Sequence, residues 1–319
     1  MKPRCRLSIW ILSGVILAAA LALAAELRCS LCGVTIPDQA NYYQLKGGRE
    51  IYCARCYASA PRCSLCKLPT APGYIDSETG ACPACLAKLP RCNTCGKPIL
   101  GAAYEFPSNK GVFCPQCIET RPACYICGVP VGNDHWDYPD GRITCGACGA
   151  RAINDVGEIE RIMQDARQTI EAHLKLKITR PYSLRVEKLS SLTAAGIDPH
   201  AKILSDRSPL YGKELGMYRF VDNKSEIFLL FGLPPEMLYE AAAHVYAHAW
   251  QVENCPAELA PALREGFAQW VAAEVLRFKG FRGTLEKLEA RRDFPYGTGY
   301  QRLKGLPLQA VMALLPKRQ

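Results

Sequence analysis

The chain has 319 residues, which leaves room for two or three domains, each with its own core. Its 49% hydrophobic and 22% charged residues are typical of a folded, soluble protein. The net charge of +9 is spread along the chain without a long run of lysine or arginine. A nucleic-acid-binding protein would need a basic stripe with interleaved aromatic residues, so we expect no nucleic-acid partner.

The first 25 residues differ from the rest of the chain. Lys2, Arg4 and Arg6 precede an uncharged run of 19 residues, 7–25, which closes on the small-x-small triplet Ala-Leu-Ala at 22–24. This order predicts a secretory signal peptide, and the run is also nearly long enough to cross a bilayer as an uncleaved anchor. Both alternatives keep the basic residues on the cytoplasmic side. We therefore expect an exported protein that is periplasmic, secreted, or membrane-anchored and facing outward.

Cysteines form an internal repeat. Sixteen of the 18 fall into eight Cys-x-x-Cys pairs, and the gaps between pairs run 20, 6, 15, 6, 18, 6 and 17 residues. One pair presents two thiolates, so a tetrahedral zinc site needs two pairs. Pairing across the long gaps uses every pair, whereas pairing across the short gaps strands the first and the last. The four predicted zinc sites are Cys29, Cys32, Cys53 and Cys56; Cys63, Cys66, Cys82 and Cys85; Cys92, Cys95, Cys114 and Cys117; and Cys124, Cys127, Cys145 and Cys148.

Each site defines a small module, and these are called the first (29–56), second (63–85), third (92–117) and fourth (124–148) modules. Disulfides are the alternative in an exported chain, but two-residue spacing in every pair favours metal. Iron is possible at such sites, although nothing selects it. Each module has too few apolar residues to fold alone, so bound metal must supply much of its stability.

Other features repeat in phase with the cysteines. Gly33, Gly96 and Gly128 follow the second cysteine of a pair, where a tight turn favours positive φ. Short hairpins are expected near 42–52 and 104–113. The modules resemble LIM-type fingers, which are structural platforms for other proteins, although six residues rather than two separate successive fingers and no histidine replaces a cysteine. We expect residues 26–150 to form four LIM-like modules that bind a protein partner.

The remaining residues, 153–319, carry the pattern of a helix-rich domain. An apolar stripe of helical period runs through 153–178, and strands are expected near 182–189, 216–221 and 226–231. The Gly-Leu-Pro-Pro sequence at 232–235 ends the last strand and starts a helix over about 235–252. A second helix is expected over about 261–278. The whole chain is therefore expected to be α+β, with tandem zinc-ribbon or LIM-like fingers before this domain.

Two histidines on the first of these helices are candidate metal ligands. His244 and His248 are four residues apart and share one helix face, and Glu265 follows 17 residues later on the expected return helix. Two histidines and one glutamate, with the fourth position open, form a catalytic type of zinc site. In zinc peptidases the residue after the first histidine is a glutamate that acts as general base, and here that residue is Val245. The alternative is a pair of structural histidines satisfied by hydrogen bonds.

The Ala-His-x-x-x-His-Ala-Trp segment at 243–250, the Glu-Gly pair at 265–266 and the Tyr-Gly-Thr-Gly-Tyr segment at 296–300 resemble the peptidase domain of the plant DA-one-type proteins. Those proteins join LIM fingers to a zinc peptidase domain, which is also the order expected here. The resemblance covers most of residues 29–319 and implies a zincin-like (gluzincin) domain over 153–319. It also implies that His244, His248 and Glu265 hold zinc and that Val245 replaces the family's glutamate.

These patterns predict an exported multi-zinc protein with a peptidase-like domain that is inactive and binds proteins or peptides. Four structural zinc ions are expected in the fingers, and a fifth in the peptidase-like domain. The alternative is an active zinc metallopeptidase with a non-standard general base, for which Glu240, one helical turn before His244, is the candidate. No residue is assigned a catalytic role, because Val245 can neither accept nor donate a proton.

Overall fold

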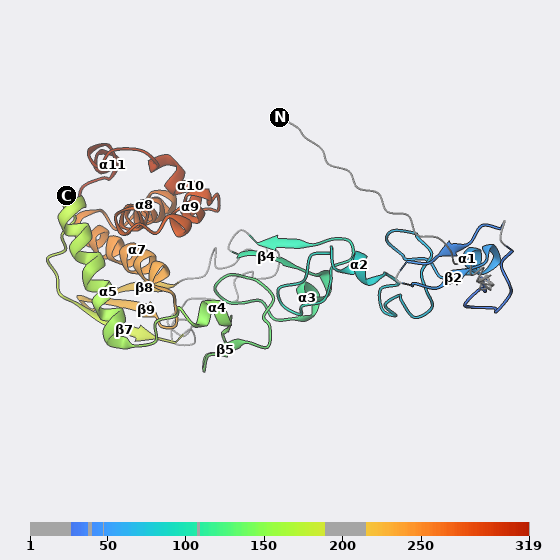
Figure 1. The fold of residues 1–319 in the computed structure, drawn as a ribbon. Helices are drawn as coiled ribbons and strands as arrows, with labels where there is room; N and C mark the ends of the chain where they lie inside the picture. The colour runs from blue at the N-terminus through green and yellow to red at the C-terminus, as the bar shows by residue number, and fades with distance from the viewer. Residues whose placement is uncertain (1–26, 38–39, 47, 107–108, 189–214, 319) are drawn as a thin grey trace, which may run out of the picture. The chain divides into compact units, whose positions relative to one another are not determined.

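The computed structural model describes residues 27–37, 40–46, 48–106, 109–188 and 215–318, and the chain divides into two compact units, Met1–Leu89 and Pro90–Gln319. The predicted signal peptide or anchor at 1–25 lies outside the described residues. Among the helices that are described, none is long and apolar enough to cross a membrane. The predicted α+β class is confirmed: four small cysteine modules precede a mainly helical C-terminal part (Figure 1).

The first unit contains the first two modules. In the first, β1 (Tyr43–Gln44) and β2 (Ile51–Tyr52) form the antiparallel hairpin expected near 42–52, and α1 (Ala54–Ser59) starts directly after Cys53. The second module has only a short helix, α2 (Pro83–Leu86), among its described residues. A parallel bridge between Lys46 and Thr70 joins the two modules.

The second unit begins with the third and fourth modules, which repeat the hairpin and helix. The third has β3 (Tyr104–Phe106), β4 (Asn109–Phe113) and α3 (Pro115–Thr120), as expected near 104–113. The fourth has β5 (His135–Asp137), β6 (Ile143–Cys145) and α4 (Gly146–Gly149). In both, a helix starts immediately after the third cysteine, so the fourth cysteine lies on its first turn.

The turn after the second cysteine has a left-handed residue in every module. Gly33, Gly96 and Gly128 have φ of 71°, 72° and 75°, which confirms the role predicted for these glycines. In the second module the same place is held by Lys67, at φ 61°. A side chain there carries a steric cost that glycine avoids, so the repeat preserves the backbone conformation even where the residue type differs.

The C-terminal part begins with α5 (Val156–Thr169), which continues into a single π-helical segment, η1 (Ile170–Leu174). The three expected strands are β7 (Tyr182–Glu187), β8 (Gly216–Val221) and β9 (Lys224–Leu230). They form one sheet in the order β7-β9-β8, in which β7 is parallel and β8 antiparallel to β9. The two expected long helices are α7 (Pro235–Asn254) and α8 (Pro261–Lys279).

Three further helices complete the C-terminal part and had no sequence prediction. They are α9 (Arg282–Ala290), α10 (Tyr296–Leu303) and α11 (Leu308–Leu314). Helix α7 is central, since it packs on α5, α8, β8 and β9, while α10 packs on α8. Alanines dominate the buried face of α7, including Ala242, Ala243 and Ala247 at 0% exposure, and such small residues let neighbouring backbones approach closely.

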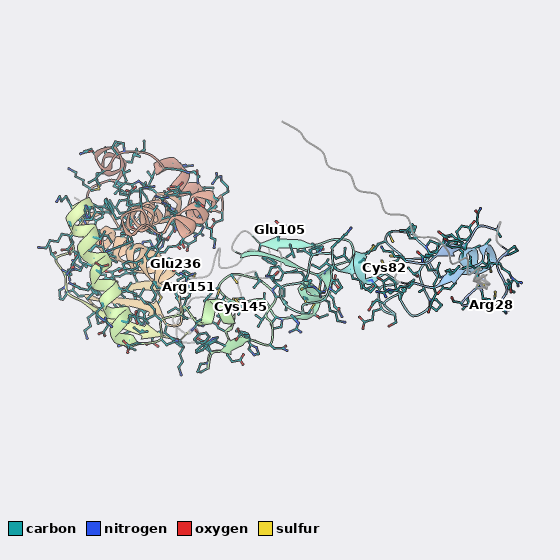
Figure 2. All side chains as sticks on the ribbon, viewed as in Figure 1. Arg28, Cys82, Glu105, Cys145, Arg151 and Glu236 are labelled. Atoms are coloured by element: carbon teal, nitrogen blue, oxygen red, sulfur yellow. The ribbon has the colours of Figure 1, made fainter. Side chains whose placement is uncertain are left out.

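The fourth module packs against the C-terminal part within the second unit. The guanidinium of Arg142 is buried; it pairs with Asp140 at 3.0 Å and donates to the backbone oxygen of Phe231 at 2.9 Å. Arg151, just after the module, pairs with Glu236 at the start of α7 at 2.8 Å (Figure 2). Three aromatic rings surround Arg142: Tyr125, Tyr138 and Phe231. The cation–π contact with Phe231 joins the fourth module to the C-terminal part.

Candidate metal centres

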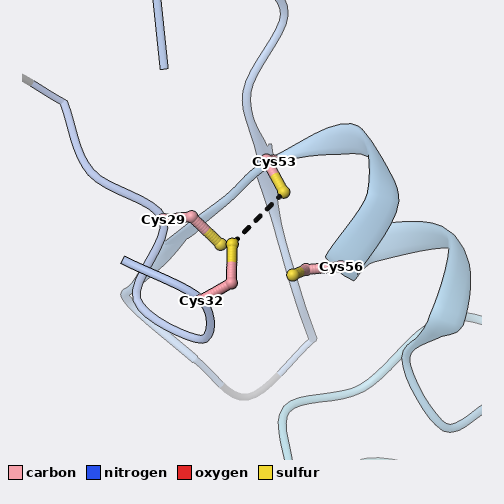
Figure 3. A group of neighbouring side chains, drawn as sticks. All are labelled: Cys29, Cys32, Cys53 and Cys56. Atoms are coloured by element: carbon pink, nitrogen blue, oxygen red, sulfur yellow. Dashed lines mark hydrogen bonds between the residues drawn. The ribbon is translucent and has the colours of Figure 1, made fainter. Parts of the chain in front are cut away.

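The structure brings together each predicted group of four cysteines. The sulfur atoms within each group lie within 4.8 Å of one another. Figure 3 shows the first group, in which Cys29 and Cys32 come from the turn and Cys53 and Cys56 from the start of α1. Each module thus supplies four neighbouring sulfur atoms from one turn and one helix start, the number that a structural zinc site requires.

Sulfur–sulfur distances decide between a metal site and disulfides. The Sγ atoms of the second and third cysteines of a module are 3.9 Å apart in the first and third modules and 3.7 Å apart in the fourth. A disulfide needs about 2.05 Å, whereas four sulfurs at about 2.3 Å from a tetrahedral zinc ion lie about 3.8 Å from one another. The described cysteines are all free thiols. The groups therefore fit zinc and do not fit disulfides.

Backbone N–H groups stabilise the thiolate form that metal binding requires. The amide of Cys82 donates to the sulfur of Cys63 at 3.3 Å, and the amides of Cys114 and Cys145 make the same contact in the third and fourth modules. Hydrogen bonds from the amides of residues 66 and 82 lower the pKa of Cys63 to about 5. Charge-assisted hydrogen bonds of this kind favour the anion, so the local backbone prepares these cysteines as metal ligands.

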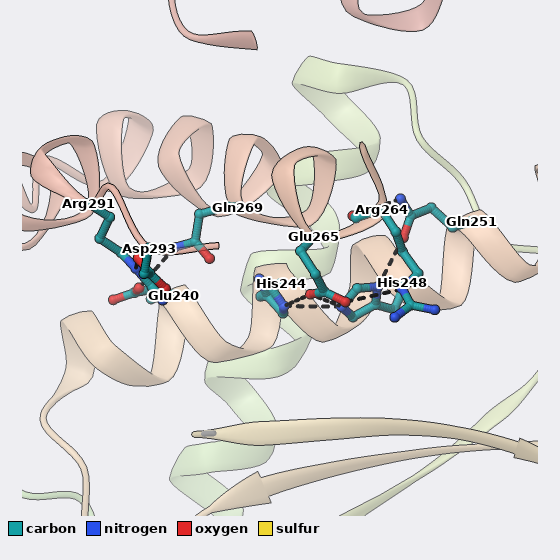
Figure 4. Close-up of polar contacts among 9 residues, drawn as sticks. All are labelled: Glu240, His244, His248, Gln251, Arg264, Glu265, Gln269, Arg291 and Asp293. Carbon is teal, nitrogen blue, oxygen red and sulfur yellow. Dashed lines mark hydrogen bonds and ion pairs between the residues drawn. The ribbon is translucent and has the colours of Figure 1, made fainter. Parts of the chain in front are cut away.

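A second kind of ligand group lies between α7 and α8. Figure 4 shows Glu265 reaching from α8 toward His244 and His248, which lie one turn apart on α7. The Nε2 atoms of the histidines are 3.1 Å apart, and the Oε2 atom of Glu265 is 3.3 Å from His244 and 3.2 Å from His248. Nitrogen and oxygen ligands at 2.0–2.1 Å from tetrahedral zinc would lie about 3.3–3.4 Å apart. The three atoms therefore fit one zinc ion.

Gln251 orients the second histidine. Its carboxamide nitrogen donates to the backbone oxygen of Arg264 at 3.0 Å, so its oxygen faces the Nδ1 atom of His248 at 2.9 Å. The proton of a neutral His248 therefore lies on Nδ1, and Nε2 carries a lone pair. That lone pair faces the carboxylate oxygen of Glu265, which requires a proton or a metal cation between the two atoms. A polar group that orients a ligand histidine in this way is a usual feature of zinc sites.

Burial and the neighbouring charges set the ionisation of the group. Burial lowers the pKa of His244, so its neutral, metal-binding form is favoured. Burial opposes ionisation of Glu265, but the two neighbouring histidines outweigh burial and hold the pKa of the carboxyl below its usual range. Arg264 also donates to the second oxygen of Glu265 at 3.1 Å. The group thus presents two imidazoles and a carboxylate, as zinc requires.

Glycines explain how α10 comes to lie beside this group. A Cβ atom on Gly266 would lie 2.4 Å from the backbone carbon of Gly299, and a Cβ on Gly299 would lie 2.0 Å from the backbone oxygen of Ala262. Helices α8 and α10 therefore touch through their backbones. This contact holds Tyr296, the first residue of α10, with its ring centroid 6.0 Å from that of His244. The Glu-Gly and Gly-Thr-Gly segments are thus packing requirements of the site.

Val245 lies between the ligand group, which is His244, His248 and Glu265 and is called the cradle, and the sheet. Its side chain is only 2% exposed, and a Cβ built on Gly216 of β8 would lie 3.2 Å from its Cγ1 atom. The side chain belongs to the main hydrophobic core and also lines a pocket over the two histidines. The structure therefore has an apolar contact with β8 at the position where a zinc peptidase has its general base.

A pocket of about 740 Å³ opens over the group. Its walls come from α7, α8, β8, α10 and the fourth module, and they include both histidines and Glu265. Glu240 lines the same pocket, and its carboxylate accepts a hydrogen bond from Gln269 at 3.3 Å. Burial raises the pKa of Glu240 despite the nearby charge of Arg291. Figure 4 shows Glu240 beside Gln269, Arg291 and Asp293, nearer the start of α7 than the two histidines.

The sequence predicted the ligand atoms but not the residues that support them. Gln251, Arg264 and Gln269 were not singled out, although Gln251 lies three residues after His248 and so shares its helix face. No protein-family model matches the chain, and no curated protein and no solved structure matches it significantly. The four cysteine groups and the His-His-Glu group therefore rest on this chain's own geometry.

Proposed function

We propose that this protein is an exported multi-zinc protein whose C-terminal domain, 153–319, is an inactive zincin-like domain that binds polypeptide segments. Four zinc ions would be held by the cysteine groups and a fifth by His244, His248 and Glu265. The single observation that carries the proposal is Val245, a buried apolar side chain at the general-base position of an otherwise complete ligand group.

The chemistry of the site supports binding over cleavage. Zinc at such a site acts as a Lewis acid toward a carbonyl oxygen, and a peptide carbonyl is a suitable ligand. Efficient hydrolysis also needs a group that accepts a proton from water, and its loss typically costs about 10²–10⁴-fold in rate. Val245 cannot accept a proton, so the arrangement retains ligand binding and lacks this contribution.

The shape of the pocket supports an extended peptide as the ligand. Residues of β8, among them Gly216, Met217 and Tyr218, form one wall. Within the described residues β8 hydrogen-bonds only to β9. An extended peptide can pair with such an edge through its main chain and place alternate side chains in the pocket. Ile126 of the fourth module and Arg151, just after it, also line the pocket, so the fingers would contribute to the choice of partner.

The experiment combines metal counting with a proteolysis assay on the purified protein. The unaltered protein should hold about five zinc ions, and His248→Ala about four. Neither should cleave an unfolded substrate such as reduced, alkylated casein. Zinc-dependent cleavage that His248→Ala abolishes would refute the proposal, and a content of four zinc ions in the unaltered protein would refute the fifth site.

The alternative is an active metallopeptidase that uses Glu240 as its base. The observation in its favour is that Glu240 lines the same pocket as the ligand group. This alternative requires that Glu240→Gln, which keeps the size and the hydrogen-bonding oxygen, abolish cleavage without changing zinc content.

Export is proposed from the sequence of residues 1–25. A signal peptide and a membrane anchor can be distinguished by mass and by partitioning. A chain cleaved after a signal peptide would lack these residues and remain in the aqueous phase. An anchored chain would retain them and sediment with membranes. Recovery of the full-length chain from the cytosol would refute export.

A further inference from the structure

A lysine of the first module lies against the sulfur atoms of the second. The Nζ atom of Lys46 is 3.4 Å from the Sγ of Cys66 and 3.7 Å from the Sγ of Cys85. The ammonium group thus faces two of the four cysteines of the second group, although it belongs to another module.

Backbone pairing holds Lys46 in this place. Its amide donates to the backbone oxygen of Pro69 at 3.2 Å, and its own backbone oxygen accepts from the amide of Ala71 at 3.4 Å. Lys46 is half-buried and follows Leu45, which is 2% exposed in the small core of the first module. Its position therefore depends on the folded hairpin of the first module, and its side chain crosses to the second.

The lysine contact should change the charge of the second zinc site. Four thiolates around one zinc ion leave two excess negative charges on the sulfur atoms. An ammonium that donates to these sulfurs offsets part of the charge and withdraws electron density from them. The charge compensation should strengthen zinc retention. The loss of electron density should make the thiolates poorer nucleophiles, because thiolate character controls cysteine reactivity.

We propose that Lys46 is an outer positioning residue of the second zinc site, so that the folded first module sets the zinc affinity and thiolate reactivity of the second. The two modules then form one metal-dependent unit. The proposal rests on zinc in the second cysteine group and is independent of the peptide-binding role of the C-terminal domain.

The test uses the zinc-loaded full-length chain, pulsed with N-ethylmaleimide and mapped by peptide mass spectrometry. Outer groups around a metal typically contribute 10–100-fold to its affinity. Lys46→Met should therefore raise the alkylation rates of Cys66 and Cys85 about 10–100-fold, with release of one equivalent of zinc. Lys46→Arg, which retains the charge, should restore slow alkylation. Cysteines of the third and fourth modules should react as in the unaltered chain.

Lys88→Met is the matched control, because Lys88 is an exposed residue just after α2 and its replacement makes the same change in charge. Equal alkylation of Cys66 in the Lys46→Met and Lys88→Met variants would overturn the proposal. It would also fail if Lys46→Met exposed Cys29 and Cys53 as fast as Cys66, because Lys46 would then stabilise only its own module. If the unaltered chain held fewer than four zinc ions and Cys63 and Cys82 were alkylated at once, the second zinc site itself would be refuted, and the proposal with it.

Discussion

The backbone contact between α8 and α10 gives the sharpest test of how the C-terminal site is built. Gly299→Ala would place a Cβ atom 2.0 Å from the backbone oxygen of Ala262, whereas ordinary contact begins at 3.4 Å. The difference, 3.4 − 2.0 Å, means that α10 must move from α8 by about 1.4 Å, because neither backbone can rotate away. Forced overpacking of this size costs about 1–3 kcal/mol.

Gly283→Ala is the control, because Gly283 lies on the exposed face of α9 and a Cβ there meets nothing within 4 Å. Gly283 is in the first turn of α9, so the gain from alanine should be smaller than the roughly 1 kcal/mol that separates alanine from glycine in a helix interior. We therefore expect opposite changes in the free energy of unfolding: a loss for Gly299→Ala and a small gain for Gly283→Ala.

Urea unfolding followed by tryptophan fluorescence measures the difference, because Trp250 and Trp270 are buried in the C-terminal part. The urea midpoint should fall for Gly299→Ala and rise or stay constant for Gly283→Ala. Equal midpoints for the two variants would refute the close contact. Alkylation of the cysteine modules should not change in either variant, since the contact involves only the C-terminal helices.

Two further predictions concern the cradle. Val245→Glu should give zinc-dependent cleavage of casein at least about 10²-fold above the unaltered chain. Val245→Gln, which has a side chain of the same size but no base, should not gain cleavage. Equal activity in the two variants would show that the missing base is not the defect. Gln251→Ala should lower zinc affinity at the fifth site about 10–100-fold in a chelator competition, because His248 loses the acceptor at Nδ1. Gln251→Glu keeps that acceptor but loses the hydrogen bond to the Arg264 oxygen, so it should lose less zinc affinity than Gln251→Ala. An equal loss in the two variants would contradict the role assigned to the acceptor.

Much of the site could be predicted because its signals are local. The spacing of Cys-x-x-Cys pairs indicated the four groups, since two residues between thiols are what a single turn needs to face one metal. His244 and His248 share a face wherever 244–248 is helical. The helical periods at 153–178 and 235–252 predicted α5 and α7 for the same reason, because a helix repeats every 3.6 residues whatever it packs against.

Tertiary structure alone decided what depends on partners far along the chain. The order β7-β9-β8, with β7 parallel, goes with the packing of α7 on β8 and β9 and of α5 on β7, and no alternation within a strand indicates it. The apolar contact of Val245 with Gly216, and the reach of Lys46 into the second module, join residues that no local pattern relates. The spacing of the ligands is determined within short segments of the sequence. The groups that tune those ligands are placed by packing between segments. The sequence could therefore predict the ligands, but only the tertiary structure showed their neighbours.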